Sequence, residues 1–122
     1  MSADPRPGAV ALREKRCAPC EGGVDPLDNA QAKELLQSLH EDWQLSDDGK
    51  EIARTFPFAG WRRTMAFANA VSWVADTEGH HPRLEIGYGD CRVVWTTNAI
   101  EWLSVNDFIC AAKVDVLVEE AD

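Results

Sequence analysis

The chain has 122 residues, of which 45% are apolar and 27% charged, which suits one domain with a hydrophobic core. Its formal net charge is −9, from 21 acidic and 12 basic side chains. Such an acidic surface repels phosphate groups, so direct binding to nucleic acid or to anionic membranes is not expected. No apolar run approaches the length of a membrane span.

The amino-terminal residues 1–24 mix proline, glycine and charge without a helical or strand period. We expect a flexible arm there, followed by a single domain over residues 25–122. Residues 1–11 contain no apolar stretch typical of a secretory signal, so the expected location is the cytoplasm. The four cysteines (Cys17, Cys20, Cys91 and Cys110) are then expected to be thiols.

Three helices and four strands are predicted from Asp28 onward. The helices are expected from Asp28 to Leu39, from Trp61 to Glu78, and from Ser104 onward. The strands are expected at Trp43 to Ser46, Glu51 to Phe58, Leu84 to Tyr88, and Cys91 to Thr97. The order α-β-β-α-β-β-α predicts an α+β fold with two layers, in which three helices cover one face of a four-stranded antiparallel sheet.

Two positions in these elements carry further information. Arg54 falls on the apolar face of its strand, beside Ile52 and Phe56, and therefore must reach solvent, an anion or the sheet edge. Ser104 and Asp107 have the spacing of a capping box, which favours a structural role for Asp107 at the start of the last helix.

The adjacent pair His80-His81 is the first candidate for chemistry, because histidine is the side chain whose pKa lies nearest neutrality. The pair precedes Pro82, so it is expected in a loop that leaves the preceding helix. A surface or local hydrogen-bonding role is an alternative. Metal binding is another, since Asp76 and His80 are spaced i, i+4, but zinc needs three or four ligands and no second cluster stands out.

Cysteine and tryptophan supply weaker signals. Cys17 and Cys20 form a C-x-x-C, but zinc would need two further ligands and a redox motif would be expected beside a βαβ unit, so ordinary thiols are the simpler interpretation. The five tryptophans are Trp43, Trp61, Trp73, Trp95 and Trp102. Most are expected in the core or in subunit contacts, and one or two could stack on a planar ligand.

The pattern Asp76-x-x-x-His80-His81-Pro82, followed by Tyr88 and Asp107, resembles the signature of pterin-4a-carbinolamine dehydratases. Further segments also resemble bacterial members, namely Arg54-x-Phe56-x-Phe58, residues 65–69, residues 78–82 and residues 106–113. The resemblance covers roughly residues 28–115, and the Cys17-x-x-Cys20 arm is similar to the amino terminus of some bacterial relatives. It implies the same α-β-β-α-β-β-α fold, assembled into dimers or tetramers.

The resemblance also implies an activity, the removal of water from a 4a-hydroxytetrahydropterin to give a quinonoid dihydropterin, with no metal or organic cofactor. In that reaction His80 would be the main acid/base, His81 would orient the substrate, and Asp76 would hold His80. Tyr88 and Trp95 would shape the wall of the substrate cleft.

One position departs from the family pattern. The third active-site histidine of the family falls at Asn98, which can form hydrogen bonds to substrate but cannot shuttle a proton at neutral pH. The first hypothesis is therefore an enzyme of pterin recycling, of reduced activity. The second is a non-catalytic protein on the same scaffold, such as a dimerisation cofactor of a transcription factor or a RuBisCO assembly factor, with a protein partner.

Overall fold

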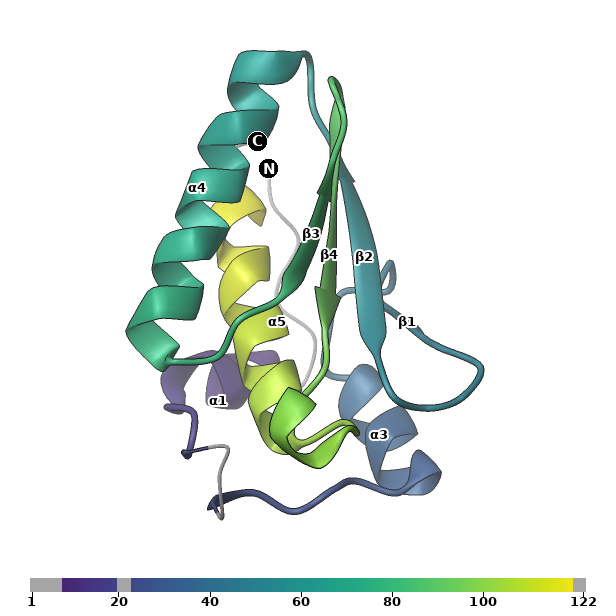
Figure 1. The fold of residues 1–122 in the computed structure, drawn as a ribbon. Helices are drawn as coiled ribbons and strands as arrows, with labels where there is room; N and C mark the ends of the chain where they lie inside the picture. Colours follow the sequence, from purple (N-terminus) through teal and green to yellow (C-terminus); the bar gives the residue numbers. More distant parts are fainter. Residues whose placement is uncertain (1–7, 20–22, 120–122) are drawn as a thin grey trace.

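The computed structural model describes residues 8–19 and 23–119 and contains a four-stranded antiparallel sheet (Figure 1). Its strands are β1 (Gln44–Leu45), β2 (Ile52–Pro57), β3 (Arg83–Ile86) and β4 (Asp90–Trp95), in the spatial order β1-β2-β4-β3. The two predicted hairpins, β1-β2 and β3-β4, are joined because β2 pairs with β4 along its whole length, from Ile52 opposite Trp95 to Pro57 opposite Asp90.

Two long helices, α4 (Trp61–Glu78) and α5 (Val105–Glu119), lie side by side against one face of this sheet (Figure 1). Helix α3 (Asn29–Leu36) packs next to β1, and a short 3₁₀ turn, η1 (Asn98–Ile100), connects β4 to α5. The predicted α+β class with a four-stranded antiparallel sheet is therefore confirmed. An additional short helix, α1 (Ala9–Glu14), contacts α5 and was not predicted.

The helix ends follow from local sequence. Asp28 caps α3 in a capping box, because its carboxylate accepts from the N–H of Gln31 while the Gln31 side chain accepts from the N–H of Asp28. Gly79 ends α4 with φ of 68°, a left-handed conformation that glycine adopts without strain. The chain therefore leaves the helical path at residue 79, immediately before the histidine pair.

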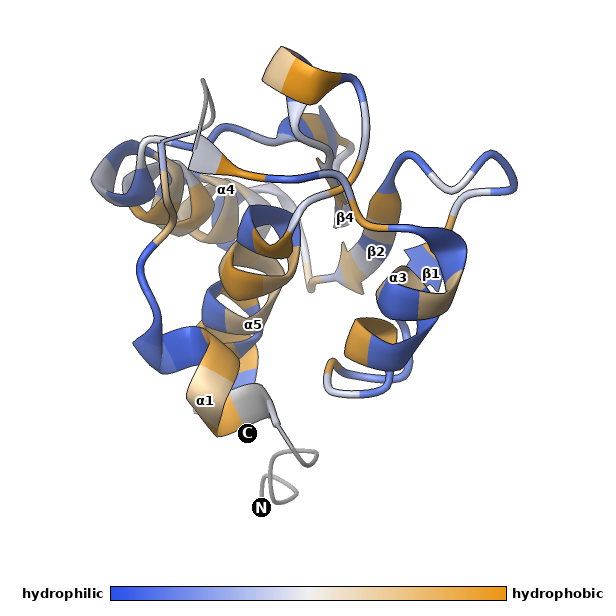
Figure 2. Ribbon diagram, turned by 90° about the horizontal axis from the view of Figure 1, so that it is seen from below, coloured by the Kyte–Doolittle hydropathy of each residue, from blue (hydrophilic) through white to orange (hydrophobic). Residues whose placement is uncertain are grey.

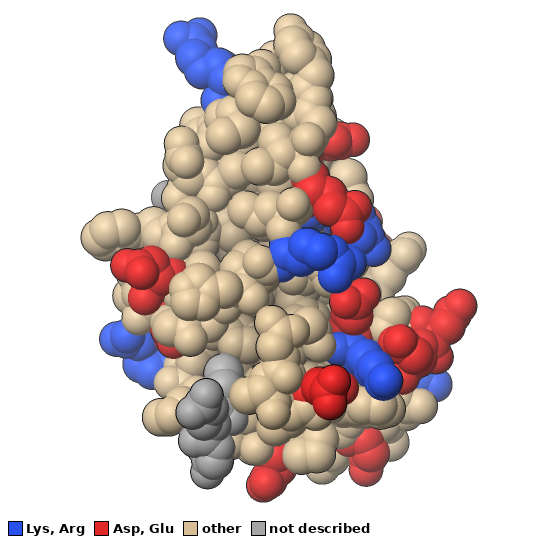
Figure 3. Space-filling view, viewed as in Figure 1, with Lys and Arg blue, Asp and Glu red and all other residues tan. Residues whose placement is uncertain are grey.

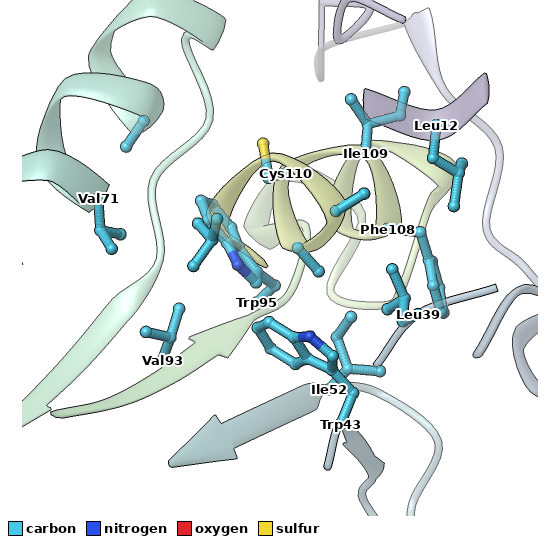
Figure 4. Close-up of a cluster of buried hydrophobic side chains, with 14 of the residues drawn as sticks. Leu12, Leu39, Trp43, Ile52, Val71, Val93, Trp95, Phe108, Ile109 and Cys110 are labelled. Carbon is cyan, nitrogen blue, oxygen red and sulfur yellow. The ribbon is translucent and has the colours of Figure 1, made fainter. Parts of the chain in front are cut away.

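The core lies between the sheet and the α4/α5 layer, and Figure 4 shows its side chains converging from both. Among its fully or nearly fully buried members are Ile52, Phe56, Val71, Val93, Trp95, Leu103, Phe108, Ile109 and Val114. Seen from below, the apolar segments of α4 and α5 turn inward (Figure 2). Burial of this surface at about 25 cal/mol per Å² is the main stabilising contribution to the fold.

A buried ion pair sits at the edge of this core. Arg54 lies on the helix-facing side of β2, and its Nη1 is 2.7 Å from Oδ1 of Asp115 on α5. The indole Nε1 of Trp43 donates to the same carboxylate at 2.9 Å and 3.0 Å. Arg54 was expected to reach solvent, an anion or the sheet edge. The structure shows that it reaches an anion, the carboxylate of Asp115.

Residues 8–19 pack against the domain. Leu12 of α1 is 4% exposed and belongs to the hydrophobic core. The buried carboxylate of Glu78, at the end of α4, accepts from the backbone N–H of Cys17 at 2.8 Å. It also forms ion pairs with Arg16 at 3.0 Å and with Lys113 of α5 at 3.4 Å. Glu78 therefore joins the amino-terminal segment, α4 and α5 at one point.

Replacing Glu78 by glutamine is expected to lower the free energy of unfolding at pH 7 by about 1–3 kcal/mol, because charge-assisted hydrogen bonds are lost. Burial raises the pKa of Glu78, but the N–H of Cys17 and the cations of Lys113 and Arg16 outweigh it and lower that pKa below its ordinary value. A carboxyl with a lowered pKa contributes stability that is lost as pH falls below about 4. Urea unfolding between pH 7 and pH 3 should therefore show a shallower acid loss in the variant, and equal slopes would contradict this.

Charged side chains of both signs are interspersed on the face seen in Figure 3. On the sheet, Arg83 pairs with Glu51 at 3.2 Å, and Arg92 pairs with Glu85 at 2.8 Å. In these two ion pairs the positive charge of each arginine is balanced by a neighbouring glutamate. Within residues 8–19 and 23–119, no helix has both the length and the apolar character that crossing a membrane requires.

Candidate active site

The histidine pair leaves α4 with its two side chains in different environments. Gly79 redirects the backbone, and the N–H of His80 returns to the carbonyl of Ala75 at 3.1 Å. His80 is then 4% exposed, whereas His81 is exposed to solvent. Within the pair, His80 is held by the protein and His81 is open to solution.

Asp107, in the first turn of α5, holds His80. Its Oδ1 lies 2.6 Å from Nε2 of His80, and both side chains are buried. An ionised carboxylate only accepts hydrogen bonds, so Nε2 carries the proton in this contact. A charge-assisted bond of this length between buried groups is among the stronger hydrogen bonds in proteins. Asp107 therefore determines which ring nitrogen of His80 is protonated.

The second oxygen of Asp107 is also fully used. Oδ2 accepts from the hydroxyl of Thr97 at 2.7 Å and from the backbone N–H of Ser104 at 3.0 Å. The Ser104 hydroxyl lies 2.7 Å from Thr97 Oγ1, and it donates there because the Thr97 proton is committed to Asp107. Thr97, Ser104 and Asp107 are each 0% exposed. The carboxylate that holds His80 is thus itself fixed by two further donors, the Thr97 hydroxyl and the Ser104 N–H.

Trp95, the last residue of β4, supports the other side of the imidazole. Its ring stacks on that of His80 with a centroid distance of 5.4 Å and an interplanar angle of 11°. Trp95 is 0% exposed, so it lies beneath His80 and not in an open cleft wall. The predicted involvement of Trp95 at the site is therefore through the orientation of His80.

Asp76 occupies an exposed position on α4, and the carboxylate shown on Nε2 of His80 is that of Asp107. The i, i+4 spacing of Asp76 and His80 places two side chains on one face only while the helix continues. The left-handed Gly79 interrupts that geometry before His80. At Nε2 the acceptor is therefore Asp107, and the predicted role of Asp76 in holding His80 stays a prediction.

The two remaining predicted residues lie in different places. Asn98 is exposed at the start of η1 and directly follows Thr97, so it is adjacent to the hydrogen-bonded network. Tyr88 is 75% exposed and lies beside Gly60 at the beginning of α4, whereas His80 follows the end of α4. A helix of 18 residues spans roughly 27 Å. Within one chain, Tyr88 therefore does not share a site with His80.

Sequence reasoning found Asp107 as a helix cap, and the structure shows that one carboxylate does both tasks. The sequence feature that pointed to the second task, holding His80, is that Asp107 is the aspartate that ends the family pattern. Thr97 gave no signal of its own, because a threonine at the end of a strand is common. Ser104 was interpreted as a cap residue, and only the folded chain shows its hydroxyl beside Thr97.

The metal hypotheses concern two places. In the part of the chain that the structure describes, no group of three or more histidine, cysteine, aspartate or glutamate side chains is arranged to hold a metal ion. Cys20, one half of the C-x-x-C, lies outside the described residues. Its partner Cys17 is described, and its sulfur lies 3.4 Å from that of Cys110.

Fold and site together define a small α+β protein with a buried, oriented histidine–aspartate pair, an arrangement suited to proton transfer. The family model described as pterin 4 alpha carbinolamine dehydratase matches residues 25–117. The chain belongs to this family, as its resemblance predicted.

Related proteins support the same placement. A protein of Nitrosomonas eutropha is 54% identical over 107 residues, covering 88% of this chain and 93% of its own length. One from Legionella pneumophila is 47% identical over 107 residues, covering 88% and 95%. Both are provisionally named pterin-4-alpha-carbinolamine dehydratase.

Two solved structures share the fold. A protein of Brucella melitensis described as a transcriptional coactivator/pterin dehydratase has a TM-score of 0.72 at 24% identity, covering 76% of this chain and 98% of that one. A pterin dehydratase-like protein described as a RuBisCO assembly factor in the alpha-carboxysome has a TM-score of 0.55 at 22% identity, covering 64% and 90%. At these identities the likeness concerns the fold alone.

Proposed function

We propose that this protein dehydrates 4a-hydroxytetrahydropterin to a quinonoid dihydropterin by acid–base catalysis at His80 and His81. The family supports the reaction, and one observation supports the mechanism, namely the 2.6 Å contact between His80 Nε2 and buried Asp107. Hydroxide is a poor leaving group, so it must be protonated as the C4a–O bond breaks. A base removes a proton from a ring nitrogen of the pterin, and the released product is water.

The two histidines have complementary properties for this reaction. His80 is fixed by Asp107 and Trp95, which suits the main acid/base, because a positioned group supplies about 10²–10⁴-fold. His81 is exposed on the adjacent residue and is proposed to orient the substrate. Alanine replacement of each would separate the roles. Loss of His80 should lower kcat, and loss of His81 should mainly raise KM, while the reverse pattern would exchange the assignments.

The activity is tested by following the absorbance decay of the carbinolamine with and without the protein. Wild type is expected to accelerate the decay, and Asn98→His is expected to accelerate it further, by about 10–100-fold, because it adds a second proton-transferring group. Asn98→Gln is the matched control, since it keeps the amide. If wild type leaves the uncatalysed rate unchanged, this protein is not a dehydratase.

A second candidate function follows from Asn98, which is exposed beside the network and cannot transfer protons. On this alternative the protein binds or assembles a protein partner. The two structural neighbours are described as a transcriptional coactivator/pterin dehydratase and as a RuBisCO assembly factor. The alternative predicts an inactive wild type and an active Asn98→His variant, since the scaffold would retain the rest of the site. Activity in both the wild type and Asn98→His would favour the enzyme.

The proposal includes a homodimer or homotetramer. Several large apolar side chains are exposed in the single chain, at 73% for Trp73, 51% for Trp61 and 40% for Ile86. We propose these side chains as subunit contacts, because apolar surface that another chain covers is removed from water.

A further inference from the structure

Two thiols from distant parts of the chain meet behind the candidate active site. Cys17 follows α1, and Cys110 lies in α5, one turn after Asp107; their sulfurs are 3.4 Å apart. Cys110 is 0% exposed, whereas Cys17 is half-buried and therefore the more accessible of the two. A disulfide bond is about 2.05 Å long, so the sulfurs would need to approach by about 1.4 Å.

The backbone on both sides of this contact is held in place. The N–H of Cys17 donates to the buried carboxylate of Glu78 at 2.8 Å. The next residue, Ala18, forms two reciprocal bonds with the buried side chain of Asn106, donating to Oδ1 at 3.0 Å and accepting from Nδ2 at 2.8 Å. Asn106 is one turn before Cys110 on α5. The sulfur contact therefore results from docking of the whole segment, and not from the chance rotamer of a side chain.

We propose that Cys17 and Cys110 form a redox-active dithiol that hydrogen peroxide oxidises to an intramolecular disulfide. The Cys17 thiolate attacks one oxygen of hydrogen peroxide and the O–O bond breaks, which converts Cys17 to a sulfenic acid. The hydroxide that leaves takes up from solvent the proton that Cys17 had released, and becomes water. The Cys110 sulfur then attacks the Cys17 sulfur, and the sulfenic hydroxyl leaves as a second water. Two thiols lose two electrons in total, and one peroxide is reduced to two waters.

The order of the two steps follows from the environment of each sulfur. Cys17 is reached from solvent, which the first step requires. The hydrogen bond with the Cys17 sulfur is the largest cause, and burial the second, of a pKa of the Cys110 thiol above its ordinary value. Cys110 is consequently protonated at neutral pH and unsuited to attack a peroxide first. Its proton is available to the hydroxyl group that leaves in the second step.

The consequence of oxidation is a covalent connection between the amino-terminal segment and the helix that carries Asp107. The bridge would link residues separated by 93 positions, and closing so long a loop restricts the unfolded chain strongly. Oxidation is therefore expected to raise Tm by about 10 °C. Formation of this disulfide does not require the dehydratase activity, so either can be absent while the other is present.

The test is peptide mapping of the full chain after treatment with hydrogen peroxide, alkylation of free thiols and trypsin digestion without reductant. Cleavage after lysine and arginine gives three cysteine-containing peptides, residues 17–33 with Cys17 and Cys20, 84–92 with Cys91, and 93–113 with Cys110. The expected product is a cross-link between peptides 17–33 and 93–113, which dithiothreitol reverses. Peptide 84–92 should be alkylated throughout.

Three single variants identify the bonded sulfurs. Cys20→Ser should keep the cross-link and the rise in Tm, whereas Cys17→Ser and Cys110→Ala should lose both. Cys91→Ala is the control, because its thiol is buried in β4. A disulfide confined to peptide 17–33, a cross-link that Cys20→Ser abolishes, or four alkylated thiols after peroxide would each overturn the proposal. If Cys110→Ala folds poorly, Cys17→Ser and Cys20→Ser still decide between these outcomes.

Discussion

Replacing Asp107 by asparagine is expected to lower kcat for carbinolamine dehydration by about 10²–10⁴-fold while the fold is retained. The new amide must direct its oxygen toward the Ser104 N–H and the Thr97 hydroxyl, because both are donors. Its NH₂ group then faces His80 Nε2 and donates to it, so the imidazole must carry its proton on Nδ1. The variant therefore holds His80 in the opposite tautomer.

The same replacement behind the catalytic histidine of serine proteases lowers kcat about 10⁴-fold for this reason. Nitrogen NMR of His80 gives a readout that a purely structural role would not change, because it distinguishes the two tautomers. Asp90→Asn, the same change in an exposed carboxylate at the start of β4, is the matched control. Asp76→Asn in the same assay tests the carboxylate that sequence spacing had favoured. A larger loss from Asp76→Asn than from Asp107→Asn would contradict the assignment.

Replacing Asp115 by alanine is expected to lower the free energy of unfolding by about 3–5 kcal/mol, the usual cost of breaking a buried ion pair. The side chain of Arg54 is 10% exposed, so without Asp115 its guanidinium group stays buried without a counter-charge. The Trp43 N–H loses its acceptor as well. Urea unfolding with linear extrapolation measures the change, and a loss below about 1 kcal/mol would show that water replaces the carboxylate.

A double variant separates the ion pair from its surroundings. Arg54→Met combined with Asp115→Asn removes both charges and keeps an oxygen acceptor for Trp43, so its stability should return to within about 1 kcal/mol of wild type. The exposed pair between Arg92 and Glu85, with a similar distance of 2.8 Å, is the matched comparison. Glu85→Ala should cost less than about 1 kcal/mol, because solvent screens exposed pairs.

The contribution of Asp115 to the free energy of unfolding is expected to decrease as pH rises. Burial raises the pKa of Asp115 above its ordinary value, although the Trp43 N–H and Arg54 act to lower it. The folded state then keeps this proton to higher pH than the unfolded state, so stability is lost as pH rises through the folded pKa. The double variant should lack this component, which runs opposite to that of Glu78.

Local sequence was sufficient where the determining interactions are local. The bounds of α4 follow from the stripe of Phe67, Val71 and neighbouring residues and from Gly79 as the helix end, and the structure shows that helix over the predicted residues. Both hairpins were predicted from alternation and turn residues. Each of these signals depends on contacts within a few residues, so an isolated segment already carries them.

Local sequence failed for α1. A helix of six residues is too short to be stable by itself, because nucleation costs more than so few hydrogen bonds return. The packing of Leu12 in the core supplies the stabilisation, and that contact requires α5, about 100 residues later in the chain. The adjacency of β2 and β4 has the same character, since neither strand specifies its neighbour alone.

For the site, the sequence by itself determined the histidine pair, the helix that ends before it, and the family to which the chain belongs. Only the tertiary structure decided which carboxylate holds His80. Spacing favoured Asp76, but a turn at Gly79 rotates the following residue away from the helix face, and the distant Asp107 is brought within 2.6 Å by packing of α5 against α4 and β4. Hydrogen bonds between segments depend on how the layers dock, and no local pattern encodes that.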